Sequence, residues 1–243
     1  MSREVSIQVF LALLEEIMLI LASQSKYRKK LMRDFGLRFK AMKPDLDEAQ
    51  IKKEWFQAWR LKNKNQKLKL SDYKKLAVHL AQKKALSVSI QTAQNPTFVI
   101  GSDQIAVLGS EQLSKPGTLQ KAQKQLLKMR GKTHSLVTAV CVVCYKNKKT
   151  TFQQAVVTAT IKMKKFTTAE MKWTLLKDHP IDCAGSYKLE KSGLRLIESL
   201  KVADFTAIVG LPMIQTARLL SLLGYSDLPS PSKSQKSRKA EAN

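Results

Sequence analysis

A single carboxylate between two apolar segments is the feature of residues 98–116 that most constrains the fold. Residues 98–100 predict a buried strand, and Gly101 allows the backbone to turn or to approach a ligand closely. Lys115 precedes a proline, which holds it in an extended conformation. A hairpin here would bring Asp103 and Lys115 together, which suits a metal and phosphate site. Spacing alone leaves a second interpretation open, in which Asp103 forms a turn at the end of a strand.

The rest of the chain alternates between strand-like and helix-like segments, which is typical of an α/β fold. The sequence around residues 167–170 is a capping box, which opens a helix. Strands are predicted at residues 18–22, 37–40, 133–145, 151–163 and within 197–209. Helices are predicted at residues 23–35, at 50–90 with a break at 63–65, at 118–129, after 167 and at 211–223.

The formal net charge of +24 favours anionic partners: nucleotides, nucleic acid or a membrane surface. Residues 50–90 hold 11 Lys or Arg against 2 acidic residues, so much of this excess is interpreted as the solvated face of helices. No apolar stretch is long enough to span a membrane, and the weakly charged first residues argue against a secretory signal.

The three cysteines give little support to a zinc site or a disulfide framework. Cys141 and Cys144 lie in a β-like run, where an odd separation sends the two thiols to opposite faces. They are therefore not expected to share a metal, and no second pair exists to complete a zinc site. Cys183 has no obvious partner, and this usage suits a reducing compartment, which we take to be the cytoplasm.

Two charged clusters are candidates for binding sites. Cations crowd the first turns of the helix at residues 23–35, where the helix dipole favours an anion. A bound phosphate held by backbone N–H groups would relieve this conflict; a merely basic surface helix is the alternative. Three nearby carboxylates, Asp45, Asp47 and Glu48, are candidates to hold a divalent cation. Their alternative role is to place acidic groups at a helix N-terminus.

Several blocks in this order resemble the Maf-like nucleoside triphosphate pyrophosphatases over about residues 18–224. Residues 21–31, LASQSKYRKKL, are similar to the family's opening L-A-S-x-S-P-x-R-R-x-L. Here Lys26 stands where proline is usual, and Lys29 replaces the second arginine. The further matching blocks are residues 80–85, 100–104, 114–116, 131–134, 183–187 and 209–212.

Within that family, the motifs look like those of the branch that acts on 7-methyl-GTP. The features are Tyr27 before Arg28, Gln104 after Asp103, and the His-Pro…Cys-Ala-Gly-Ser-Tyr-Lys sequence of residues 179–188. The resemblance implies hydrolysis of a nucleoside triphosphate to the monophosphate and pyrophosphate, with a divalent cation such as Mg²⁺ or Mn²⁺. It also implies a mixed α/β sheet bent into two lobes around a cleft, similar to inosine triphosphatase, and a possible homodimer.

The resemblance assigns roles to individual side chains of this sequence. Asp103 is expected to accept the proton of the attacking water, and Glu48 to hold the metal. The residues expected to set substrate specificity are Tyr27, Gln104 and Glu190. The residues expected to grip the triphosphate are Ser23, Arg28, Lys29, Lys84 and Lys115. Replacement of the second arginine by Lys29 keeps the charge and loses planar, bidentate recognition of phosphate.

Three segments are expected: an N-terminal extension at residues 1–17, a pyrophosphatase domain at 18–226 and a basic disordered tail at 227–243. Residues 50–70 are longer and more basic than the family pattern. One alternative function is a pyrophosphatase acting on UTP, TTP or 5-methyl-UTP. Another is a basic RNA-binding protein on the same fold; the charge leaves nucleic acid open as a partner, although no aromatic RNA-binding motif is seen.

Overall fold

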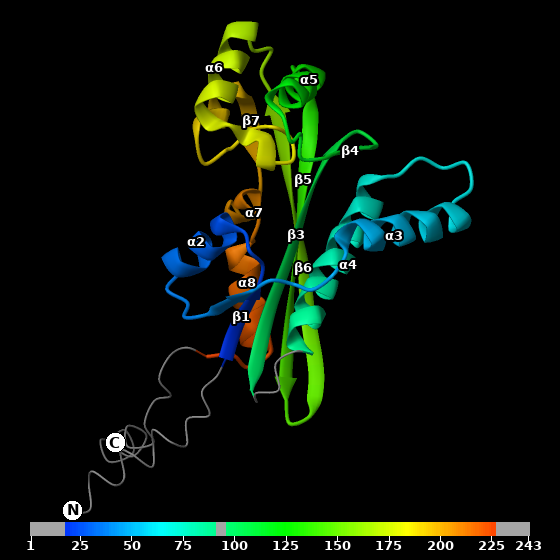
Figure 1. Cartoon of the computed structure of the whole chain (residues 1–243), viewed down its shortest axis with the longest axis vertical. Coiled ribbons are helices and arrows are strands. Elements are labelled where there is room, and N and C mark those ends of the chain that lie inside the picture. The colour runs from blue at the N-terminus through cyan, green and yellow to red at the C-terminus, as the bar shows by residue number, and fades with distance from the viewer. Residues whose placement is uncertain (1–17, 91–95, 227–243) are drawn as a thin grey trace, which may run out of the picture.

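The computed structural model describes residues 18–90 and 96–226 (Figure 1). The predicted extension at 1–17 and tail at 227–243 lie outside these described residues. The strands are β1 (Met18–Ala22), β2 (Lys40–Met42), β3 (Thr97–Leu108), β4 (Glu111–Leu113), β5 (Thr133–Lys146), β6 (Lys149–Met163) and β7 (Ile197–Lys201). The helices are α2 (Lys26–Asp34), α3 (Glu48–Lys62), α4 (Leu70–Ser89), α5 (Leu119–Met129), α6 (Thr168–Asp178), α7 (Thr206–Val209) and α8 (Met213–Leu222), with 3₁₀ helices η1 (Pro180–Asp182) and η2 (Ser192–Leu196).

The strands form one mixed seven-stranded sheet in the order β2-β1-β3-β5-β6-β7, and β4 pairs with β3. β1 is parallel to β2 and β3, whereas β3, β5, β6 and β7 pair antiparallel in sequence. The predicted α/β class is therefore confirmed. The hairpin expected between the two long β runs is also present, because β5 and β6 are joined by a tight turn at Asn147 and Lys148, both with positive φ.

β3 is one continuous strand, so the chain does not turn at Gly101, which was one of the two roles considered for this glycine. A Cβ atom at Gly101 would lie 2.2 Å from the backbone oxygen of Ala81 and 2.7 Å from the backbone nitrogen of Ala85. Glycine is needed here because α4 packs directly on the strand, and the close approach is to a helix rather than to a ligand. The hairpin expected after Asp103 comes later, where β3 turns into β4.

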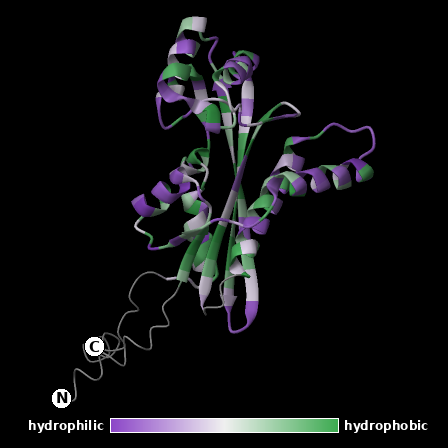
Figure 2. Ribbon diagram, viewed as in Figure 1, coloured by the Kyte–Doolittle hydropathy of each residue, from purple (hydrophilic) through white to green (hydrophobic). Residues whose placement is uncertain are grey.

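Two hydrophobic clusters cover opposite faces of the sheet around β1, β3 and β5. One contains the buried face of α4, and the other contains residues of α2 and α8. Cys141 belongs to the first and Cys144 to the second, which confirms that the two thiols lie on opposite faces. Figure 2 shows hydrophobic residues concentrated along the long strands and hydrophilic ones along α2 and the connection from α3 to α4.

A third cluster lies at the far end of the long strands, where α5, α6 and the residues before β7 pack together. The helix caps explain where these helices begin. The Thr118 side chain accepts a hydrogen bond from the backbone N–H of Lys121 in α5, and Thr167 with Glu170 forms the predicted capping box of α6. The molecule thus has two packed regions along one twisted sheet, as the two-lobed prediction requires.

The segment between β2 and α4 differs from the rest of the fold. The short strand expected at 37–40 is found slightly later, at Lys40–Met42. α3 contains no buried residue, and in Figure 1 it and its connection to α4 extend away from the sheet. No described helix is long and apolar enough to cross a membrane.

Candidate active site

A cleft of about 980 Å³ lies along the middle of β3, between the two packed regions. Its walls come from the loop after β1, the start of α3, one residue of α4, the end of β4 and the segments 182–190 and 208–210. Lys29, expected to bind phosphate, is not among the lining residues. The other nine predicted site residues all line the cleft: Ser23, Tyr27, Arg28, Glu48, Lys84, Asp103, Gln104, Lys115 and Glu190.

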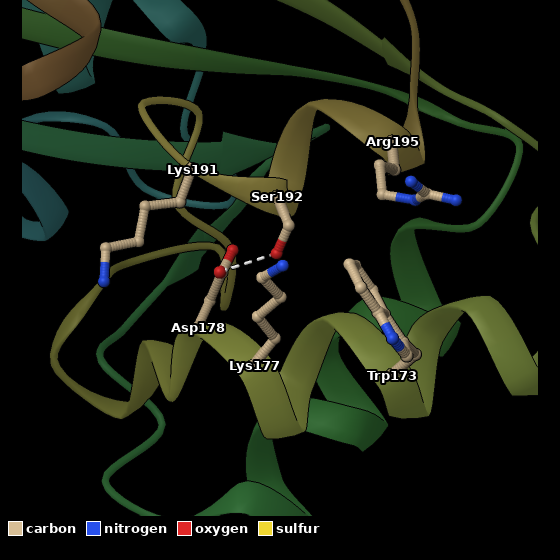
Figure 3. Close-up of a pocket in the computed structure, with 6 residues that line it drawn as sticks. All are labelled: Trp173, Lys177, Asp178, Lys191, Ser192 and Arg195. Carbon is tan, nitrogen blue, oxygen red and sulfur yellow. Dashed lines mark hydrogen bonds between the residues drawn. The ribbon is translucent and has the colours of Figure 1, made fainter.

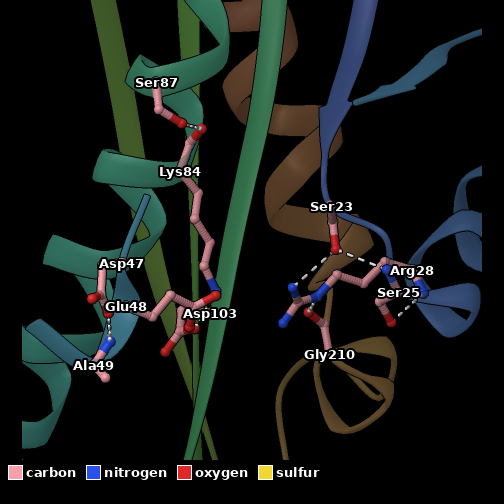
Figure 4. Close-up of polar contacts among 10 residues, drawn as sticks. All are labelled: Ser23, Ser25, Arg28, Asp47, Glu48, Ala49, Lys84, Ser87, Asp103 and Gly210. Carbon is pink, nitrogen blue, oxygen red and sulfur yellow. Dashed lines mark hydrogen bonds and ion pairs between the residues drawn. The ribbon is translucent and has the colours of Figure 1, made fainter. Parts of the chain in front are cut away.

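Two carboxylates and one ammonium meet at the centre of the cleft (Figure 4). The Lys84 Nζ atom lies 2.7 Å from Asp103 Oδ1 and 3.0 Å from Glu48 Oε1. Lys84 and Asp103 are buried, whereas about half of the Glu48 side chain is exposed. The second oxygen of Asp103, Oδ2, is buried and has no hydrogen-bond partner in the structure. Asp103 is therefore held through one oxygen and keeps the other available to accept a proton.

Strand alternation and the contact at Gly101 place this group. Gly101 and Asp103 are two residues apart, so their side-chain positions lie on the same face of β3. That face is the one covered by α4, whose backbone touches Gly101 and whose Lys84 reaches Asp103. For Glu48, burial alone would raise the pKa, but the charge and hydrogen bond of Lys84 lower it overall. Both carboxylates thus face the same ammonium.

Arg28 occupies the opposite side of β3, as Figure 4 shows. Its Nε donates to the Gly210 carbonyl oxygen at 2.8 Å, and its Nη1 lies 3.3 Å from Ser23 Oγ. Ser25 caps α2 by accepting from the Arg28 backbone N–H. Burial lowers the pKa of Arg28, and the charges of Asp103 and Glu48 act against that shift. The crowded cations at the start of α2 therefore include one that is fixed at the cleft wall.

The segment before α8 is tied to the sheet by polar side chains of β3 and β5. Gln104 Nε2 lies 2.9 Å from the Ala207 carbonyl oxygen and 3.0 Å from that of Ile208. Thr138 Oγ1 donates to the same Ala207 oxygen at 2.8 Å. The amide nitrogen of Gln104 is thus engaged with the protein backbone, so its effect on a substrate would come through the position of this segment or through its amide oxygen.

A second ion pair lies near Tyr27 at the other side of the cleft. The buried Lys188 Nζ lies 3.2 Å from Asp182 Oδ1 and 6.0 Å from the centre of the Tyr27 ring. It also donates to the Asp178 carbonyl oxygen at 3.1 Å. For Asp182, burial alone would raise the pKa, but hydrogen bonds from Lys188 and Cys183 lower it overall. Sequence reasoning assigned Asp182 and Lys188 no role; the available signal was their position within the family motif at residues 179–188.

The acidic trio predicted to hold a cation does not converge on one point. Asp47 caps α3 by accepting from the backbone N–H groups of Ala49 and Gln50, and Glu48 pairs with Lys84. No group of three or more His, Cys, Asp or Glu side chains suited to a metal ion occurs among the described residues. Within the cleft, the carboxylates of Glu48 and Asp103 lie on either side of the Lys84 ammonium.

A smaller hollow of about 570 Å³ lies away from the cleft, between α6 and η2 (Figure 3). The Trp173 ring lies there with Lys177 Nζ and Arg195 Cζ each 4.8 Å from its centre. Ser192 Oγ donates to Asp178 Oδ1 at 2.6 Å. None of the predicted site residues lies in this hollow.

Curated proteins of known name are similar in sequence to most of this chain. One relative, from Bdellovibrio bacteriovorus, is 36% identical over 202 residues, covering 83% of this chain and 95% of the relative. Another, from Albidiferax ferrireducens, is 38% identical over 212 residues, covering 86% and 95%. Both are named 7-methyl-GTP pyrophosphatase. The family model described as Maf-like protein matches residues 18–223, and the chain therefore belongs to the Maf-like protein family.

Proposed function

We propose that this protein hydrolyses 7-methyl-GTP to 7-methyl-GMP and pyrophosphate in the cleft along β3. The observation that carries the proposal is the buried Asp103, whose Oδ2 atom is unpartnered while Oδ1 is held by Lys84. This arrangement lies in a chain whose relatives are named for that reaction. A cleft of about 980 Å³ is in the size range of small-molecule sites.

The reaction needs one proton acceptor and several positive charges. Asp103 Oδ2 takes a proton from water as the water oxygen forms a bond to the α-phosphorus. The bond from that phosphorus to the oxygen bridging to the β-phosphate then breaks, and pyrophosphate leaves with the bonding electrons. Arg28 and Lys115 line the cleft and supply positive charge for the departing phosphates, with Ser23 beside Arg28. Lys84 orients Asp103 through the 2.7 Å contact.

A divalent cation, Mg²⁺ or Mn²⁺, fits the carboxylates of this cleft. The partly exposed Glu48 carboxylate would hold it, with phosphate oxygens and water completing its coordination, which leaves Asp103 Oδ2 to accept the proton. When bound, such a cation stabilises negative charge on phosphate oxygens. A single carboxylate plus substrate oxygens suits Mg²⁺ at nucleotide sites, because this ion retains several waters.

Specificity for the methylated base follows from charge. The 7-methylguanine ring carries a delocalised positive charge, which the face of Tyr27 attracts when stacked on it. Glu190, also in the cleft wall, can accept hydrogen bonds from the guanine N1–H and N2–H₂ edge. Lys188 lies close to Tyr27 and would repel this base, and Asp182 neutralises it at 3.2 Å. Gln104 contributes by holding the segment at Ala207 and Ile208.

A substrate panel tests this assignment. We expect kcat/KM for 7-methyl-GTP to exceed clearly the values for GTP, UTP, TTP and 5-methyl-UTP, with pyrophosphate as a product. Glu190→Ala is expected to narrow the preference for 7-methyl-GTP over UTP, because a pyrimidine never used that carboxylate. Equal kcat/KM for 7-methyl-GTP and UTP in the wild-type protein would contradict the proposal that 7-methyl-GTP is the substrate, and would leave a pyrophosphatase of the same family with another specificity.

We further propose a cytoplasmic location, which the three free thiols support. The homodimer stays a prediction.

A further inference from the structure

The segment that projects from the body of the molecule comprises residues 48–75, here called the basic arm: α3, its connection to α4 and the first turns of α4. None of the 15 residues of α3 is buried. The arm extends from the sheet in Figure 1, and its N-terminal end forms part of the cleft wall through Glu48 and Lys52. Its apolar residues Ile51, Trp55 and Phe56 pack, partly buried, against one core cluster, so packing accounts for these positions and not for the cationic ones.

The composition of the basic arm is strongly cationic. Its 28 positions hold nine Lys or Arg and three acidic residues. Seven of the nine cations are exposed: Lys53, Arg60, Lys62, Lys64, Lys67, Lys69 and Lys75. Because these cations share one projecting segment, each lies in the positive field of its neighbours.

None of the three acidic side chains of the basic arm forms a salt bridge with a cation of the arm. Glu48 pairs with Lys84, and Glu54 accepts a hydrogen bond from Gln50. Asp72 accepts from the backbone N–H of Lys69. None of the nine cations takes part in a salt bridge between described residues. These cations are therefore available to neutralise the phosphates of a nucleic acid, and the counterions released from the nucleic acid make that binding favourable.

We propose that the basic arm binds the phosphate backbone of nucleic acid. The 15 residues of α3 span about 22 Å, so the cations are spread over several phosphate spacings rather than gathered around one small anion. A lipid surface fits less well, because an interfacial helix needs an exposed apolar face. Among the described residues of the arm, Leu61 is the large hydrophobic side chain that is exposed, while Ile51 and Phe56 pack towards the core cluster.

The test is fluorescence anisotropy of a labelled oligouridylate, compared with a DNA duplex of similar length and with vesicles containing phosphatidylserine. The full-length protein is expected to bind nucleic acid, and its affinity is expected to fall as salt rises from about 50 to 200 mM. The triple variant K62E/K64E/K67E is expected to raise Kd for the oligouridylate by more than about tenfold. The magnitude of its slope of log K against log salt should fall by about 2, because each phosphate that a lysine no longer neutralises removes about 0.7 from the slope.

A matched control reverses three exposed lysines of α5 and α6, K121E/K124E/K172E, with the same change in net charge. It should change Kd by less than about twofold, because the proposed phosphate-binding lysines lie on the arm. Hydrolysis of a mononucleotide by both variants checks folding, since none of the six lysines lines the cleft. Equal weakening by both triples, no binding at moderate salt, or tighter binding to the vesicles than to either nucleic acid would overturn the proposal. Oligouridylate and duplex results together show whether the backbone is read as single-stranded or duplex.

Discussion

At the scale of single residues, the cleft is defined by paired charges in which one member stays partly free. Lys84 forms ion pairs with Glu48 and with Asp103 Oδ1. The second oxygen of Asp103, Oδ2, is buried and has no hydrogen-bond partner. A buried carboxylate oxygen without a partner is costly unless a substrate, water or ion uses it. A second ion pair, between Lys188 and Asp182 at 3.2 Å, lies beside Tyr27.

The Asp103→Asn variant is expected to fold normally and to lose hydrolysis by roughly two to four orders of magnitude. Asparagine keeps the shape and the oxygen near Lys84 but removes proton acceptance. Single-turnover release of pyrophosphate measures the loss, and thermal unfolding checks the fold. The control is Asp72→Asn, which changes the same chemical group at the start of α4 away from the cleft. If Asp103→Asn kept half of the wild-type rate, Asp103 would not be the base.

The Asp182→Asn variant is expected to lower kcat/KM for 7-methyl-GTP by roughly two- to fivefold, the range of a partly exposed ion pair. Loss of the carboxylate leaves the Lys188 ammonium uncompensated near Tyr27, which disfavours a cationic base. GTP, whose base is neutral, should be affected less. Competition between the two nucleotides in one assay measures the ratio directly. An equal loss for both would assign Asp182 a general structural role.

His134 makes folding stability depend on pH. It is buried, its Nε2 atom lies 2.6 Å from Tyr187 Oη, and burial lowers its pKa from 6.5 to about 4. The unfolded chain therefore binds a proton that the folded chain refuses, so stability falls as pH drops from about 6.5 to about 4. The contribution is about 3 kcal/mol. Calorimetry at pH 7 and pH 4.5 should show a smaller loss for His134→Gln than for wild type; equal losses would exclude His134 as a cause.

At the scale of elements, the contact between α4 and β3 sets the geometry of the cleft. α4 carries Lys84, and β3 carries Asp103, so a shift of one element past the other separates the pair. The contact is tight at Gly101, where backbone atoms of α4 occupy the space of a side chain. The same helix also supplies much of one hydrophobic cluster, which keeps it in place.

Gly101→Ala is expected to cost about 1–3 kcal/mol of stability, the range for overpacking. The added Cβ would meet backbone atoms at 2.2 and 2.7 Å, so α4 must move. Hydrolysis should fall with it, because Lys84 moves as part of the helix. Gly109→Ala provides the control: its φ of 62° also disfavours alanine, but nothing lies within 4 Å of the new Cβ, so activity should persist. Full activity in Gly101→Ala would show that the cleft tolerates movement of α4.

At the scale of the whole molecule, the three hydrophobic clusters are drawn from residues between Met18 and Tyr225. A chain trimmed to residues 18–226 therefore retains every residue of these clusters. We expect it to fold, to hydrolyse 7-methyl-GTP at close to the full-length rate, and to melt within a few degrees of the full-length protein. Differential scanning calorimetry and a steady-state assay compare the two. A large drop in melting temperature would show that a removed segment packs on the core.

Local features were predictable from the sequence because their causes lie within a few residues. Thr118 and the Thr167–Glu170 pair cap their helices through groups three positions away. The opposite orientation of Cys141 and Cys144 follows from strand alternation. The family motifs also contain most residues that line the cleft. They indicate which side chains belong to one site, but not which atoms of those side chains are in contact.

Tertiary structure alone decided how those side chains are used. Lys84 and Asp103 are 19 positions apart, and Arg28 and Gly210 are 182 apart, so their contacts depend on packing of α4, β3 and the segment before α8. Packing also placed Gly101 against a helix, where a turn or a ligand contact had been considered. It also engaged the amide nitrogen of Gln104 with backbone carbonyl oxygens. Local sequence sets φ and ψ preferences and caps, whereas the partner of a buried charge is chosen by which elements lie against it.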